Sequence, residues 1–262
     1  MRSAEFYDSE GDMRMINISR GKQVDGQLST EIKAVTFDLD DTLWPVWPAI
    51  GRAEEKMQAW LQEHAPKIVD RFGVEGLQQL RNQIAAEKPD LEYHISLMRI
   101  LAMREAAEQA GYAPVVGEQA FQVMWEERNR VDFFVDVKPV LIQLREQGLM
   151  LGALSNGNAD INQVGLGDQF DFSLNAVSGG APKPATNMFS RAADLAGYTP
   201  AQMAHVGDDL ASDVAGAAAA GLVTIWLNRS VDQDPLSLAD FEIRSLEELP
   251  RLIAEINESG AG

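Results

Sequence analysis

Two aspartates with one residue between them follow a short apolar segment early in the chain. Residues 34–37 (AVTF) are apolar or β-branched and predict a buried strand, and residues 38–42 (DLDDT) follow it directly. At an extended strand end, the side chains of Asp38 and Asp40 lie on the same side. Such paired like charges favour a divalent cation such as Mg²⁺, which binds carboxylates, water and phosphate oxygens. For this segment alone, the alternative is a solvated acidic turn capped by Thr42.

Two later segments carry groups that could bind phosphoryl oxygens. Residues 155–158 (SNGN) follow a predicted strand, and the Ser155 hydroxyl together with main-chain N–H groups could stabilise developing negative charge. Taken alone, this segment is more typical of an ordinary Asn-Gly turn. Lys183 lies between two prolines, which restrict its backbone and would hold its charge in a fixed position. The alternative for Lys183 is one more exposed lysine.

A further acidic segment, residues 207–213 (GDDLASD), ends a predicted strand and begins a predicted helix. It contains Asp208, Asp209 and Asp213. Asp is a favoured N-cap residue, so helix capping is an alternative role for Asp213. Because the chain has 40 acidic residues, each acidic segment alone could be turn or cap chemistry. The order and spacing of the segments carry the argument.

The elements that must position these segments alternate between strand and helix. Apolar runs predict strands, and helical spacing with polar faces predicts helices. The predicted strands are 34–37, 149–154, 204–206, 223–227 and 241–243, and the helices between and after them are 137–147, 187–196, 213–220 and 246–256. This alternation implies an α/β fold with a doubly wound parallel sheet. In such a sheet, ligands bind beyond the carboxyl ends of the strands, where the polar segments lie.

A helical module interrupts the alternation directly after the first acidic segment. Helical spacing covers residues 50–64, 77–87, 95–110 and 119–130, with breaks at Pro66, Gly73, Pro89 and Gly111. The sequence therefore predicts three parts. They are a flexible N-terminal leader over 1–30, a catalytic core over 31–45 and 135–262, and an inserted helical module over 46–134.

Together, the four segments resemble the motifs of the haloacid dehalogenase-like hydrolases in their phosphatase form. The DxDxT pattern of 38–42, Ser155, Lys183 and the GDxxxxD pattern of 207–213 occur in family order. The resemblance implies a Rossmann-like doubly wound sheet with a cap, which here would be the inserted helical module. The true dehalogenases of this family lack the second aspartate of the first motif. Asp40 therefore favours a phosphatase over a dehalogenase.

The resemblance also implies a role for each motif residue. Asp38 would be the nucleophile that forms an aspartyl-phosphate intermediate, Asp40 would be the general acid and base, and Lys183 would steady the nucleophile and the phosphate. The phosphate-binding residues would be Ser155, Asn156 and Thr42. The ligands of a Mg²⁺ cofactor would be Asp38, Asp208 and Asp40 through its main-chain carbonyl. Asp213 would hold Lys183 or a metal-bound water, and Asp209 would be an auxiliary acid.

In this family, a cap selects the substrate. The residues in or near the insert that could contact a substrate are Trp44, Trp47, Tyr93, His94 and Arg99. Aromatic residues could stack on a planar ring, although Trp in a helical module is more often part of the core. Residues 93–94 and 164–170 look similar to bacterial flavin mononucleotide (FMN) phosphatases of this family. This similarity implies a small phosphorylated metabolite as substrate, with FMN or another riboflavin-pathway phosphate as candidates.

Composition narrows the possible partners. The chain has 22 basic and 40 acidic residues, so its net charge of −18 argues against nucleic-acid and anionic-membrane binding. It has no cysteine, so any metal is held by oxygen or by its three histidines. We find no signal peptide and no apolar run long enough to span a membrane, and we expect a cytoplasmic protein. The sequence leaves a monomer and a homodimer equally open.

Two other functions compete with the phosphatase hypothesis. A phosphomutase of the same fold uses the same aspartates, and an assay of phosphate release against isomer formation separates the two activities. A nonenzymatic binding protein with this fold would be favoured by loss of Asp38, Asp40 or Asp208. All three are present.

Overall fold

The computed structural model describes residues 4–7, 13–16, 31–230 and 239–260 of the chain. Most of the predicted leader therefore lies outside the described residues. Within it, β1 (Ala4–Tyr7) and β2 (Met13–Ile16) pair as antiparallel strands. Among the described residues, no helix combines the length and the apolarity that crossing a membrane requires.

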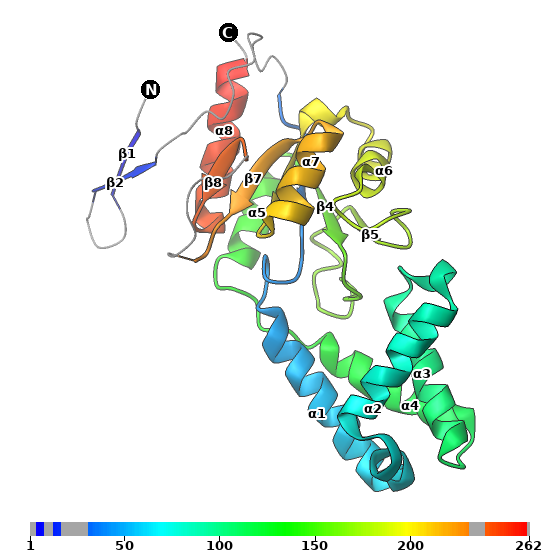
Figure 1. The fold of residues 1–262 in the computed structure, drawn as a ribbon. Coiled ribbons are helices and arrows are strands. Elements are labelled where there is room, and N and C mark those ends of the chain that lie inside the picture. Colours follow the sequence, from blue (N-terminus) through cyan, green and yellow to red (C-terminus); the bar gives the residue numbers. More distant parts are fainter. Residues whose placement is uncertain (1–3, 8–12, 17–30, 231–238, 261–262) are drawn as a thin grey trace.

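In the described part of the chain, six parallel strands form the central sheet (Figure 1). They are β3 (Ala34–Phe37), β4 (Met150–Ser155), β5 (Phe172–Asn175), β6 (Met203–Gly207), β7 (Val223–Leu227) and β8 (Phe241–Ile243). Their spatial order is β5-β4-β3-β6-β7-β8, so β3 pairs with both β4 and β6. Every residue of β3, β6 and β7 is buried, which explains why these strands read as continuous apolar runs.

Helices cover both faces of the sheet. On one face, α5 (Val137–Glu146) and α8 (Leu249–Gly260) bury their apolar sides in a cluster that includes Phe37. On the other face, α6 (Thr186–Ala196) and α7 (Ala215–Ala220) form a second cluster with the strands. Full burial of one Leu or Phe side chain stabilises the fold by roughly 1.5–3 kcal/mol. The carboxyl edge of the sheet therefore rests on a closely packed core.

A group of helices lies between β3 and β4 in the chain and extends away from the sheet (Figure 1). These helices are α1 (Val46–His64), α2 (Pro66–Glu87), α3 (Ile95–Gln109) and α4 (Pro114–Arg128), with the short 3₁₀ helix η1 (Pro89–Leu91). We call this group the insert. It buries an apolar cluster of its own, which includes Leu61 and Ile68. Gly73 breaks α2 with a left-handed φ of 55°, a conformation that glycine adopts readily.

One arginine anchors both connections between the sheet and the insert. Arg229 donates to the two carboxylate oxygens of Asp136 at 2.9 and 3.0 Å and to the main-chain oxygen of Thr42 at 3.2 Å. Thr42 precedes the insert and Asp136 follows it. The guanidinium also lies 4.1 Å from the centroid of the Phe134 ring. Burial alone would raise the pKa of Asp136, but hydrogen bonds from Arg229 and from the Leu246 N–H hold that pKa below its usual value.

The observed elements differ from the predicted ones in a few places. Strand β5 was not predicted, because in this edge strand only Leu174 is buried and the apolar pattern is weak. Helix α4 begins at Pro114, earlier than predicted, since proline is well accommodated in a first helical turn. The helix predicted over 213–220 begins with a π turn, η3 (Leu210–Val214). The last helix is preceded by a 3₁₀ turn, η4 (Leu246–Glu248), and a further 3₁₀ turn, η2 (Pro200–Gln202), precedes β6.

Candidate active site

Three neighbouring strands bring polar side chains to one edge of the sheet. Asp38 follows β3, Ser155 ends β4, and Asp208 follows β6, with β3 in the middle. The chain passes from β3 to β4 on one side and later returns to β6 on the other side. The carboxyl ends of these strands therefore flank a point where the strand order reverses, which is where doubly wound sheets bind ligands.

Lys183 is the buried cation of this edge. Its Nζ donates to Asp38 Oδ1 at 2.5 Å, to Asp213 Oδ1 at 2.6 Å and to the main-chain oxygen of Leu154 at 2.8 Å. The Asn156 side chain fixes the Lys183 backbone, accepting from its N–H at 2.7 Å and donating to its carbonyl at 2.8 Å. Although burial alone would lower the pKa of Lys183, Asp38 and Asp213 raise it, so the side chain stays charged.

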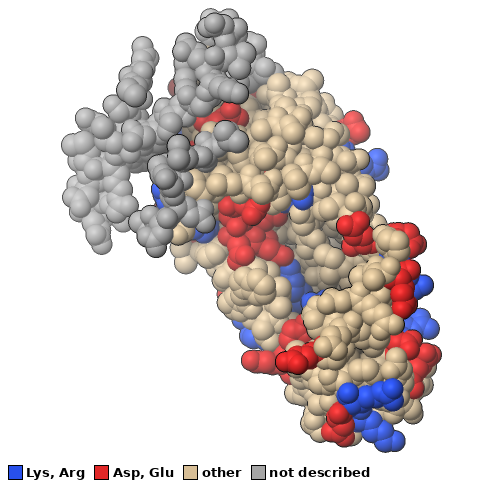
Figure 2. Space-filling model, viewed as in Figure 1, with Lys and Arg blue, Asp and Glu red and all other residues tan. Residues whose placement is uncertain are grey.

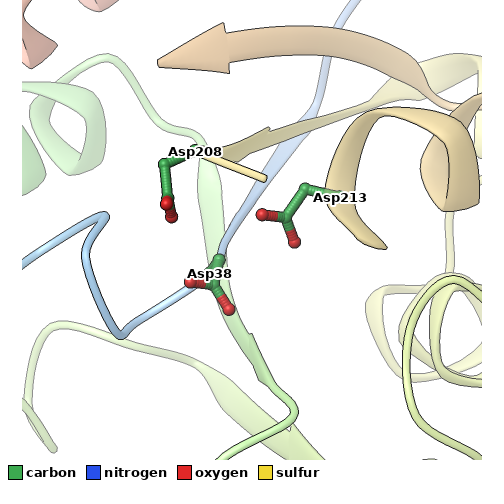
Figure 3. A group of neighbouring side chains, drawn as sticks. All are labelled: Asp38, Asp208 and Asp213. Carbon is green, nitrogen blue, oxygen red and sulfur yellow. The ribbon is translucent and has the colours of Figure 1, made fainter. Parts of the chain in front are cut away.

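Asp38, Asp208 and Asp213 point toward one another, and one carboxylate oxygen of each lies within 4.8 Å of the others (Figure 3). Burial raises the pKa of Asp38 well above its usual value despite the opposing effect of Lys183. Burial likewise raises the pKa of Asp208 to about 6. Both shifts indicate carboxylates that lack sufficient positive charge. A divalent cation with oxygen ligands fits this donor set and would supply that charge.

Asp213 is held differently from the other two carboxylates. Its Oδ1 accepts from Lys183 and lies 3.2 Å from Nε2 of the buried His205, and its Oδ2 accepts from the Asp209 N–H at 3.1 Å. Burial would raise the pKa of Asp213, but Lys183 and His205 lower it below its usual value. Asp213 is thus a fixed negative charge that orients Lys183.

A tight turn after β3 orients the residues of the first motif, 38–42. Asp41 has a left-handed φ of 60°, which Asp tolerates better than most residues, and its Oδ1 accepts from the Val46 N–H at 2.9 Å at the start of α1. Thr42 donates to Asp208 Oδ1 at 2.7 Å, so the turn is also tied to the end of β6. One local contact and one contact to a distant strand end therefore fix the path of the chain from the sheet into the insert.

Asp40 lies at the boundary between the sheet and the insert. Its carboxylate accepts from Trp44 Nε1 at 2.9 Å, and Arg128 Nη2 lies 2.7 Å from both of its oxygens. A Cβ atom at Gly157 would lie 2.6 Å from Asp40 Oδ2, so only glycine leaves room for this carboxylate. Asp40 is therefore oriented by one side chain of the turn and one side chain of the insert.

A cavity of about 160 Å³ separates this edge from the insert. Figure 2 shows the surface hollowed between the two parts. Arg99 belongs to the part of the cavity wall that the insert supplies, and it donates to Glu54 Oε1 at 2.6 Å. The residues that line the cavity are Asp40, Ile50, Ala53, Glu54, Ile95, Arg99, Met124, Arg128, Gly157 and Asn158.

Residues 32–221 match the haloacid dehalogenase-like hydrolase family. The chain belongs to this family. It is 33% identical over 231 residues to the 5-amino-6-(5-phospho-D-ribitylamino)uracil phosphatase of Escherichia coli strain K12, with 85% of this chain and 96% of that protein covered.

Two solved structures of haloacid dehalogenase-like proteins are also similar to this chain. A 2-haloacid dehalogenase from Pseudomonas syringae pv. tomato DC3000 matches with a TM-score of 0.79 and 39% identity, covering 86% of this chain and 99% of that one. A phosphatase of the family from Thermococcus onnurineus matches with a TM-score of 0.61 and 25% identity, covering 85% of this chain and 98% of that one. The fold is the α/β, Rossmann-like fold of the family, and the chain is a phosphoric monoester hydrolase.

The structure brings the motif residues of this haloacid dehalogenase-like hydrolase together at one edge of the sheet. Some of them make different contacts from those expected. The Asn156 side chain is occupied by the Lys183 backbone, and Thr42 is occupied by Asp208. Asp209 accepts from the N–H groups of residues 211 and 212, so it caps the following turn.

The residues predicted to contact substrate are scattered. Trp44 is fully buried and packs edge-on against Phe133, so the structure places it in the core and not in a position to stack on a ligand. Trp47 is 74% exposed. Tyr93 and His94 precede α3 and are not among the residues that line the cavity. Of the five candidates, Arg99 lies in the cavity wall.

Sequence reasoning missed three residues that the structure places at or next to the site. Arg128 and Glu54 reach the cavity from the insert, and His205 lies behind Asp213. A histidine inside a fully buried strand was a usable signal for His205, because such a side chain needs a polar partner. Arg128 gave no comparable signal, since a cation in the last turn of a helix is ordinary.

Proposed function

We propose that this hydrolase is a Mg²⁺-dependent phosphatase of small metabolites that works through an aspartyl-phosphate on Asp38. The observation that supports this most is the buried Lys183 Nζ, bonded at once to Asp38 and Asp213. This arrangement holds a carboxylate at the end of a central strand with a cation beside it. An anionic nucleophile needs such compensation to approach an anionic phosphate.

The Mg²⁺ ligands we propose are Asp38, Asp208 and the main-chain carbonyl of Asp40. The raised pKa values of Asp38 and Asp208 support this proposal, because burial disfavours the charged form of both carboxylates and Lys183 offsets this only in part at Asp38. When bound, the metal would neutralise charge on the phosphate and on the nucleophile. The Ser155 hydroxyl and the main-chain N–H groups after β4 would hold the remaining phosphoryl oxygens, and the charge of Lys183 would offset their negative charge.

In the first step, an oxygen of Asp38 attacks phosphorus as the ester P–O bond breaks. The electron pair of that bond goes to the leaving oxygen, which takes a proton from Asp40. In the second step, Asp40 removes a proton from water while the water oxygen attacks phosphorus. The bond to Asp38 then breaks, which releases inorganic phosphate and restores both carboxyl groups to their starting states.

We propose that residues 46–134 form a cap and that residues 31–45 and 135–262 form the catalytic core. The separate apolar cluster of the insert and its cavity wall support this division. The cavity of about 160 Å³ is close to the roughly 150 Å³ that accommodates a benzene molecule. It would hold part of a leaving group, such as a single ring or a short polyol. Because the Escherichia coli relative is named for a uracil phosphate, we rank that compound above FMN as a candidate substrate.

The test is a substrate panel with purified protein and Mg²⁺. It contains 5-amino-6-(5-phospho-D-ribitylamino)uracil, FMN, sugar phosphates, nucleotides and a 2-chloro acid, and it records phosphate, chloride and isomeric sugar phosphates separately. We expect phosphate release, with the uracil phosphate ranked above FMN. Isomer formation without phosphate release would show a phosphomutase. Chloride release as the main activity would contradict the phosphatase proposal.

A further inference from the structure

Arg128 makes fewer hydrogen bonds than its burial calls for. It ends α4 and is 4% exposed. Its Nη2 bonds both oxygens of Asp40, but its Nη1 is shielded from solvent and has no hydrogen-bond partner among the described residues. Leaving a buried charged donor unpaired is costly, so such a group calls for an explanation.

The missing partner must be an acceptor, because a guanidinium only donates. Arg128 lines the cavity together with Asp40 and Gly157, which belong to the sheet edge. The two Nη atoms of a guanidinium sit side by side in a fixed planar fork. An acceptor that bonds Nη1 therefore lies beside the group that Nη2 bonds, which is the carboxylate of Asp40.

We infer that Arg128 determines specificity by bonding an acceptor oxygen on the leaving group of the substrate. This inference rests on the proposed function, in which Asp40 protonates the ester oxygen of that leaving group. A substrate oxygen that bonds Arg128 while Asp40 protonates the ester oxygen would be attached to the carbon next to the one that carries the ester oxygen. The favoured substrates are thus phosphate monoesters with a vicinal oxygen, such as the phosphates of polyols.

The remaining wall of the cavity agrees with a leaving group of this kind. Ile50, Ile95 and Met124 supply apolar surface for carbon atoms. The Glu54–Arg99 pair, at 2.6 Å, supplies an acceptor and a donor for further hydroxyl groups. A short chain with an oxygen on each carbon presents both kinds of surface.

The experiment compares two phosphates of nearly equal shape, 2-hydroxypropyl phosphate and isobutyl phosphate, in which a methyl group replaces the vicinal hydroxyl. We expect the wild-type kcat/KM for the hydroxyl substrate to be higher by about tenfold, the size of one hydrogen bond to a charged group. Arg128→Met should reduce this ratio to near one. Arg128→Lys, which keeps a donor, should retain part of it. If Arg128 had a purely structural role, its substitution would lower kcat/KM by the same factor for both substrates and leave their ratio unchanged.

The control is Arg104→Met, because Arg104 is an exposed arginine of the same insert that pairs with Glu118. It should keep the wild-type ratio. Equal rates for the two substrates in the wild type, or a ratio that survives in both Arg128 variants, would overturn the inference while the phosphatase proposal stands. Absence of hydrolysis of any phosphate monoester with Mg²⁺ present would overturn both.

Discussion

The edge of the sheet and the wall of the insert hold their polar side chains in different ways. At the sheet edge, Lys183 bonds three acceptors and Asn156 fixes its backbone. At the insert wall, Arg99 lies against Glu54 among apolar neighbours, and Arg128 leaves Nη1 unpaired. Fully bonded groups suit a reaction that is the same for every substrate. Incompletely bonded groups suit recognition, because the substrate can complete them.

The largest effect should separate these two regions directly. Asp38→Asn removes the proposed nucleophile and should lower kcat by about 10⁴-fold or more for every substrate. Arg99→Met, in the insert wall, should change kcat/KM by about tenfold at most and differently for each substrate. Steady-state kinetics on p-nitrophenyl phosphate and on the metabolite panel measure both variants, with circular dichroism to check folding. Near-normal turnover by folded Asp38→Asn protein would refute its role as nucleophile.

Two tryptophans at the entry to the insert should differ in their effect on stability. Trp44 is fully buried and bonded to Asp40, so Trp44→Ala should lower the free energy of unfolding by about 3–5 kcal/mol. Trp47 is 74% exposed, and Trp47→Ala should change the free energy of unfolding by about 0.5 kcal/mol or less. Urea unfolding of both variants measures the difference. Equal stability of the two would mean that Trp44 is not part of the core.

Removal of the metal should act on the sheet edge and leave the insert unchanged. Chelation should abolish phosphate release, and added Mg²⁺ should restore it. Because Mg²⁺ would bind only the folded chain, it should raise the free energy of unfolding by about 2.7 kcal/mol at 100 times its dissociation constant. Thermal unfolding with and without Mg²⁺ measures this increase. The Asp208→Asn variant should lose this Mg²⁺-dependent increase, whereas Glu54→Gln should keep it. Full activity after exhaustive chelation would contradict the proposed metal dependence.

The stabilisation that Asp136 provides at the boundary between the two regions should depend on pH. The pKa of Asp136 is lower in the folded chain than in the unfolded chain, so its carboxylate stabilises the fold above the unfolded value of about 3.9. That contribution disappears as the pH falls through the folded-state pKa. Asp136→Asn should therefore cost about 1–2 kcal/mol near pH 7, and the difference from wild type should shrink below about pH 4. A difference that stays constant with pH would contradict this assignment.

The sheet edge could be predicted from the sequence because its geometry follows from local patterns. Short apolar runs end in Asp38, Ser155 and Asp208, and parallel strands bring their carboxyl ends to the same edge. The two prolines beside Lys183 favour a fixed, functional lysine, but they do not indicate that its side chain is buried. The structure shows it buried between two carboxylates.

The insert wall could not be predicted in the same way. Arg128 meets Asp40 across 88 residues, and that meeting depends on how the helices of the insert pack together and onto the sheet. Periodicity places a residue on one side of its own helix but does not say which distant group faces that side. The general tendency of Trp to lie in the core holds for Trp44 but not for the exposed Trp47, and the helical pattern does not distinguish the two.

The bonds of Arg229 to Thr42 and to Asp136 imply a particular kind of mechanical linkage. One guanidinium joins the two chain connections of the insert, so a displacement of one connection would act on the other. Asp40 lies on the sheet side of these connections, and Arg128 lies on the insert side. The Arg128–Asp40 ion pair therefore spans the boundary between the two parts. A change in the angle between the insert and the sheet would change the length of that ion pair.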